Sequence, residues 1–89
     1  MTLRIERVSV RRGTRFRISG ELRSEQLNDL RTEIECGGPQ VTLDLDELCL
    51  VDVDAVRFLN ACGAQGVKIV NCSRYLREWM HRERNQKND

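Results

Sequence analysis

The chain has one histidine, one proline and no long hydrophobic run, and its aromatic residues are two Phe, one Tyr and one Trp. The single histidine, His81, has no Ser or Cys nucleophile near it in the sequence, which argues against histidine-assisted catalysis. So few aromatic side chains leave little for nucleic-acid bases to stack on. The sequence therefore favours neither an enzyme nor a nucleic-acid-binding protein.

Targeting signals are also missing from the sequence. No apolar stretch approaches the ~20 residues that span a bilayer. Charged residues interrupt the first seven positions, so they contain no signal-peptide hydrophobic region. We expect a cytoplasmic protein without stable membrane insertion, and a length of 89 residues predicts one small domain.

Cysteine is present but does not form a metal-binding pattern. Cys36, Cys49, Cys62 and Cys72 are separated by 13, 13 and 10 residues, without a C-x-x-C pair. A structural zinc site normally uses two close ligand pairs. We therefore expect no metal and no cofactor, and we interpret the three cysteines in apolar segments (all but Cys36) as small buried hydrophobic residues.

Charge is unevenly distributed along the chain. Residues 1–20 carry a net charge of +5, residues 21–54 carry −8 and residues 55–89 carry +4. The acidic middle would repel nucleic-acid phosphates, which again favours a protein as the macromolecular partner.

The first half of the sequence predicts a hairpin followed by a helix. Alternating β-prone residues indicate two strands joined by a turn at Arg12–Thr14. A change of phase at Arg7 predicts a bulge, or two short strands, in the first of them. Ser24 has the chemistry of an N-cap, and the apolar spacing over Leu27–Ile34 predicts an amphipathic helix.

The second half alternates strands and helices. Val41–Asp46 alternates apolar and polar residues, so we expect a strand with Asp44 and Asp46 on a solvated face. A helix from Asp54, a strand at Val67–Val70 and a last helix complete the pattern.

The last helix is predicted to begin at a cap within Asn71–Ser73. We expect Trp79 and Met80 to pack in the core rather than to form a docking patch, because a core this small needs its large side chains. The predicted domain spans residues 1–82, and residues 83–89 are expected to be a polar, frayed tail.

The order strand–strand–helix–strand–helix–strand–helix predicts an α/β domain. Strands joined through helices favour parallel pairing with right-handed crossovers, whereas the initial hairpin makes the sheet mixed. We expect about four strands, with about three helices mainly on one face of the sheet.

Three segments resemble, in order, parts of the STAS domain family, which includes the anti-sigma factor antagonists. They are Gly20-Glu21-Leu22 at the end of a strand, the strand Val41–Leu48 leading to Val51-Asp52, and Gly66–Ser73, where a strand leads into a cap. The resemblance covers most of the chain. It implies a STAS-like mixed sheet and a non-catalytic role in binding a partner protein.

The family's typical signature after the third strand is Asp-Ser-Ser-Gly or Asp-Ser/Thr-x-Gly, and a partner kinase phosphorylates its first Ser or Thr. The matching run here is Asp52-Val53-Asp54-Ala55. Val53 stands at the acceptor position and has no hydroxyl, so the resemblance implies that this phosphorylation switch cannot operate. Ala55 replaces the glycine, and Ala is the better helix former.

The predicted partner-binding residues are Asp52, Val53, Asp54, Ala55 and Arg57. Asp54 is interpreted as the N-cap of the helix. The alternative is that Asp54 supplies a permanent negative charge beside the place where a phosphate would act, although one carboxylate carries less charge than a phosphate. Asp52 either caps the loop or belongs to the docking surface, whose acidity suits a basic partner.

Three functions stay open from the sequence. The leading one is an anti-sigma factor antagonist-like protein in the bacterial regulation of transcription, which binds a kinase-type anti-sigma factor. The second is a STAS-type regulatory subunit of an ABC lipid-transport complex, held against the transporter ATPase. The third is a small-ligand sensor that binds a lipid or nucleotide beside the same helix start.

Overall fold

Eight elements follow one another in the computed structural model, which describes residues 3–85. They are β1 (Leu3–Val10), β2 (Gly13–Leu22), the 3-10 helix η1 (Ser24–Gln26), α1 (Leu27–Cys36), β3 (Val41–Val51), α2 (Val53–Ala64), β4 (Lys68–Val70) and α3 (Arg74–Asn85). The order of strands and α-helices is the predicted one.

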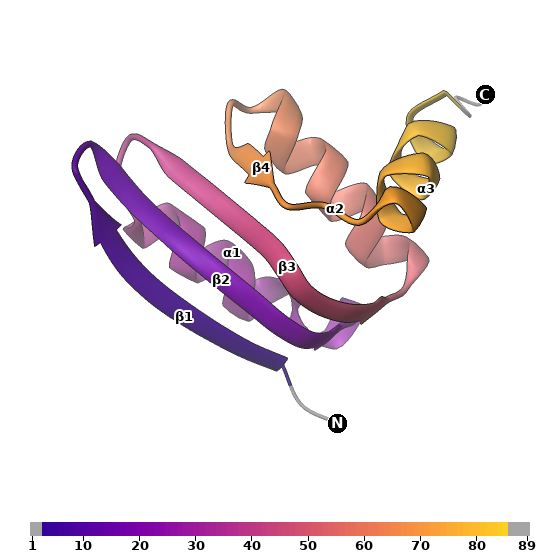
Figure 1. Cartoon of the computed structure of the whole chain (residues 1–89), viewed down its shortest axis with the longest axis horizontal. Helices are drawn as coiled ribbons and strands as arrows, with labels where there is room; N and C mark the ends of the chain where they lie inside the picture. Colours follow the sequence, from indigo (N-terminus) through magenta and orange to yellow (C-terminus); the bar gives the residue numbers. More distant parts are fainter. Residues whose placement is uncertain (1–2, 86–89) are drawn as a thin grey trace.

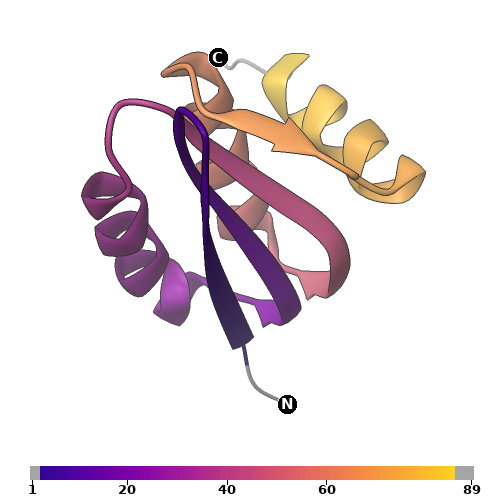
Figure 2. The same cartoon turned by 60° about the vertical axis from the view of Figure 1, so that its left-hand side comes forward.

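Within residues 3–85, four strands form one mixed sheet in the order β1-β2-β3-β4. β1 and β2 pair antiparallel as a hairpin, whereas β2 with β3 and β3 with β4 pair parallel. Each parallel pair is joined through a helix, and crossovers of one hand place α1 and α2 on the same face of the sheet (Figure 1, Figure 2). The predicted α/β architecture is confirmed.

The core lies between the sheet and these two helices. Alternate side chains of β2 and β3 point into it, because successive residues of a strand face opposite sides of the sheet. Its buried apolar members are Phe16, Ile18, Leu22, Leu30, Val41, Leu43, Leu45, Ala55, Val56, Phe58, Leu59, Cys62 and Leu76. The remaining side chains of these strands face the open side of the sheet.

β1 is a single strand, and the bulge predicted at Arg7 is wrong. Its pairing with β2 runs without a register shift, and the turn lies at Arg11–Arg12, one residue earlier than predicted. The change of phase instead moves the apolar residues of β1 from the core side of the sheet, before Arg7, to the open side after it. Ile5 packs against the core, whereas Val8 and Val10 face the open side and are 50% and 45% exposed.

The two predicted serine caps have different outcomes. Ser73 Oγ accepts a hydrogen bond from the Leu76 N–H at 3.2 Å, which confirms the cap of α3. Ser24 is not a side-chain cap, because it lies in η1 and α1 begins only at Leu27, without a side-chain cap hydrogen bond. The backbone of Ser24 has a different partner, described below.

α3 lies at the β4 side of the sheet and packs against α2 (Figure 1, Figure 2). Leu76 is buried, and Trp79 and Met80 lie half-buried against the core, as predicted. The side-chain amide of Asn60 on α2 donates a hydrogen bond to the Met80 carbonyl at 2.9 Å. These contacts fix the last helix to the second.

The prediction of a frayed tail is wrong for residues 83–85, which belong to α3. α3 continues to Asn85, and Glu83 forms an ion pair with Arg57 of α2 at 3.1 Å. The rest of the predicted tail, from residue 86, lies outside the described residues. No helix in the described part of the chain is both long and apolar enough to span a bilayer.

A carboxylate is buried on the open side of the sheet. Asp44 is 1% exposed, so the prediction of a solvated face is wrong for Asp44, whereas Asp46 is exposed as expected. Arg15 donates to Asp44 Oδ2 at 2.8 Å, and Asn71 and the Asp46 N–H donate to Oδ1 at 3.0 and 3.1 Å. Asn71 adopts a left-handed φ of 57°, which asparagine tolerates better than most residues.

These partners determine the charge state of Asp44. Burial by itself would raise the pKa of Asp44, but the hydrogen bonds from Asn71 and Arg15 outweigh it and lower the pKa from 3.8 to about 2. The ionised carboxylate therefore joins β2, β3 and the end of β4.

This arrangement predicts a pH-dependent stability. Because the pKa of Asp44 is depressed in the folded state, its contribution is complete above about pH 4 and is lost as the pH falls toward about 2, and it amounts to roughly 2 kcal/mol. Urea unfolding at several pH values should show a shallower acid decline for Asp44→Asn than for the wild type. Parallel declines in the two proteins would contradict the assignment.

Candidate functional site

The start of α2 is organised by one carboxylate, that of Asp52. Its Oδ1 accepts a hydrogen bond from the Ala55 N–H at 2.9 Å, which makes Asp52 the N-cap of α2. Its Oδ2 accepts a second hydrogen bond, from the Ser24 N–H, also at 2.9 Å. Since Ser24 opens the connection from β2 to α1, Asp52 joins the two helical connections at the carboxyl end of the parallel strands.

The prediction that Asp54 is the N-cap is therefore wrong. Asp54 lies in the first turn of α2, two residues after the cap, and it is exposed. A carboxylate at this position still interacts favourably with the positive end of the helix dipole. Its charge faces solvent and is available to a partner.

The other predicted partner-binding residues have unequal access. Val53 begins α2 and is 37% exposed, whereas Ala55 is fully buried and can only support the surface from below. Arg57 is exposed one turn after Val53, but its guanidinium is paired with Glu83. Val53 and Asp54 are thus the free members of the predicted set.

Two exposed apolar residues that the sequence interpretation missed lie at the same end of the molecule. Leu50, near the end of β3, is 46% exposed, and Tyr75, in the first turn of α3, is 68% exposed. Both line a hollow of about 30 Å³ between the end of β3 and the start of α3. We call Leu50, Val53, Asp54 and Tyr75 the α2-start surface.

The exposure of Leu50 follows from the pairing of β3. The register between β2 and β3 shifts twice, and after the second shift Leu50 pairs with Glu21 on the open side of the sheet. β4 pairs only with the first part of β3, up to Asp44. The sequence does contain a sign of this surface. The run Leu48–Val51 is apolar throughout, whereas a strand with one buried face alternates apolar and polar residues, so part of the run has to face outward.

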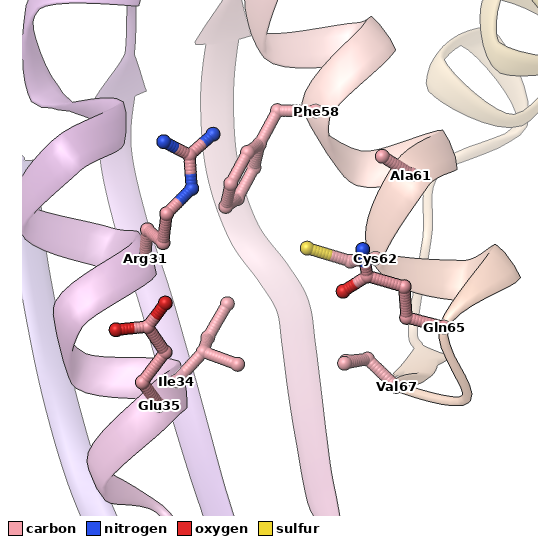
Figure 3. A pocket seen from close by; sticks show the side chains of 8 residues that line it. All are labelled: Arg31, Ile34, Glu35, Phe58, Ala61, Cys62, Gln65 and Val67. Carbon is pink, nitrogen blue, oxygen red and sulfur yellow. The ribbon is translucent and has the colours of Figure 1, made fainter.

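A second concave region lies between α1 and α2 (Figure 3). Arg31 of α1 extends over the ring of Phe58 of α2, with 5.4 Å from the guanidinium carbon to the ring centroid. Cys62 is 6% exposed at this groove, and burial raises the pKa of its thiol, which keeps it in the weakly nucleophilic protonated form. The volume of about 180 Å³ is below the roughly 300–1,000 Å³ of typical ligand pockets.

The remaining chemically reactive side chains are dispersed. His81 contacts the side chain of Asn85 on the exposed side of α3. Cys36 and Cys49 are exposed, so the prediction of burial holds fully for Cys62 but is wrong for Cys49. All four cysteines of the chain lie within the described residues and carry free thiols.

No protein-family model matches the sequence, and no significant match is found among curated proteins or solved structures.

The two hydrogen bonds that Asp52 accepts, from Ala55 and from Ser24, can be tested by substitution. Asp52→Ala removes the cap of α2 and the bond to Ser24, so the free energy of unfolding should fall by about 1–2 kcal/mol. Asp54→Ala removes a favourable charge near the helix start and should cost less than about 1 kcal/mol. Denaturant unfolding of both variants measures the difference, and a greater loss in Asp54→Ala would contradict the assignment of the cap.

Proposed function

We propose that this chain is a non-catalytic, STAS-type docking module that binds a partner protein through the α2-start surface. The observation that carries the proposal is that the end of β3, the start of α2 and the start of α3 lie at one end of the molecule, and that each has an exposed apolar residue there: Leu50, Val53 and Tyr75 (Figure 1). They are three of the five large apolar residues exposed within residues 3–85. The other two, Val8 and Val10, belong to the edge strand β1.

The chemistry of this surface suits a protein rather than a small ligand. Exposed apolar side chains rimmed by polar ones mark protein contacts, and tyrosine is enriched among the residues that dominate binding energy. The hollow between Leu50 and Tyr75, of about 30 Å³, is far below the volume of a ligand pocket. A small ligand held at the start of α2 is therefore the least supported of the three functions.

The partner is expected to combine an apolar contact with basic residues. Asp54 places an exposed negative charge beside Val53, and Val53 itself offers no hydroxyl for a phosphate. The surface is therefore fixed in charge and would be regulated by the abundance or state of its partner. The leading partner is a kinase-type anti-sigma factor.

A second candidate uses the same surface. A fixed, non-phosphorylatable contact also suits a permanent subunit of an ABC lipid-transport complex, held against the transporter ATPase. The absence of a hydroxyl at Val53 is the observation that favours this candidate, because a permanent complex needs no switch.

The test uses two matched substitutions. Val53→Lys places a charge in the α2-start surface, whereas Val10→Lys places the same charge on a valine of β1 that is 45% exposed, against 37% for Val53. Affinity capture from the source cell at low salt identifies the partner, and a titration then measures its affinity for each variant. Val53→Lys should weaken binding at least tenfold, by about 1.4 kcal/mol or more, and Val10→Lys should leave it unchanged.

The identity of the partner separates the two candidates. A kinase-type anti-sigma factor supports the first, and an ATPase with its permease supports the second. Equal affinities of the two lysine variants, both checked for folding by circular dichroism, would contradict docking at the α2-start surface.

A further inference from the structure

Within residues 3–85, no strand pairs with the outer side of the edge strand β1. β1 is the first strand in the sheet order, and no other strand lies on its outer side in Figure 1, whereas Figure 2 shows α1 near it. The Arg7 guanidinium donates a hydrogen bond to the Cys36 carbonyl at the end of α1, at 3.1 Å. β1 is eight residues long, unbulged and free of proline, and the features that protect it from pairing are three charged side chains, Arg4, Glu6 and the core-side Arg7. The opposite edge strand, β4, has only three residues.

The backbone of β1 offers hydrogen-bonding groups along this edge. Antiparallel pairing makes alternate residues direct their N–H and C=O groups toward and away from the partner strand. The Thr14 N–H donates to the Gln40 carbonyl, so Thr14 and its opposite residue, Ser9, turn these groups away from the hairpin. By alternation, Leu3, Ile5 and Arg7 also present free groups at the outer edge.

The charge pattern of β1 is complementary to a second, antiparallel copy of β1, so we expect a second copy of this chain to pair with this edge. In a two-fold, antiparallel pair of β1 strands, the residue at the centre faces its own copy. Centres at Glu6 or Arg7 would place like charges opposite each other. A centre at Ile5 instead places Arg4 opposite Glu6 twice and Leu3 opposite Arg7 twice, and the two isoleucines face each other.

The side chains near Ile5 fit this register. Arg4 and Glu6 lie on the open side with 73% and 42% of their side chains exposed, and they are already 2.9 Å apart within one chain. Leu3 and Ile5 lie on the core side and remain only partly buried, because β1 is at the edge. A second copy would cover Ile5 with its own Ile5 and Leu3 with the aliphatic stem of its Arg7.

We propose that two copies of this protein associate through antiparallel pairing of β1 strands centred on Ile5, with reciprocal Arg4–Glu6 ion pairs. The sheets of the two copies join into one, and α1 and α2 of both copies lie on the same side of it. β4 is the edge strand opposite β1, and α3, which carries Tyr75, lies beside β4 (Figure 1). The interface at β1 therefore leaves both α2-start surfaces of the dimer accessible. The proposal does not rest on the docking function.

Charge reversal tests this register. Arg4→Glu and Glu6→Arg each place like charges opposite each other in a homodimer, so each should raise the dissociation constant at least about tenfold. A mixture of the two variants restores both opposite-charge pairs and should form a heterodimer, as should the doubly reversed protein with itself. Arg12→Glu, in the exposed turn, makes the same change of charge outside the paired segment and is the control.

Sedimentation equilibrium from about 10 µM to about 1 mM, at low salt, measures the apparent mass of each protein. The wild type, the control and the mixture should approach the mass of two chains, while the single variants stay near one. A monomeric wild type at the highest concentration would overturn the proposal. So would a dimer that both single variants retain, or a mixture that does not associate.

Discussion

The Asp52 carboxylate is the constraint from which the rest of the site follows. One of its oxygens ends β3 and starts α2 by binding the Ala55 N–H, and the other holds the Ser24 N–H at the start of the connection to α1. The connections that lead to α1 and to α2 are therefore both fixed at the carboxyl end of the parallel strands. An aspartate is suited to this task because its two oxygens can accept hydrogen bonds from two segments at once.

This constraint separates the supporting residues from the accessible ones. Ala55 and Arg57 hold α2 against the core and against α3, whereas Val53 and Asp54 remain at the surface. The register shifts in β3 add Leu50 to the same end. On the open face of the sheet, Asp44 performs a comparable joining role with a buried charge. One carboxylate within β3 and one just after it therefore connect separate strands or loops.

Much of the fold could be predicted from periodicity, and the errors have identifiable physical causes. Alternation and helical spacing predicted every strand and α-helix. The change of phase at Arg7 was interpreted as a bulge, although the strand simply exchanges which face is apolar. Asp44 was placed in solvent because its partners, Arg15 and Asn71, are distant in the sequence. Leu50 and Tyr75 were missed for the same reason, since only the folded chain brings them together.

We propose above that a partner protein binds the α2-start surface. This binding is tested most directly by following the backbone amide signals of the isotopically labelled protein by NMR while its purified partner is added. Docking at the α2-start surface predicts that the largest changes fall on Cys49–Asp54 and on Arg74–Tyr75, with little change along β2. Changes centred on the groove between α1 and α2, or on the open face of the sheet, would contradict it.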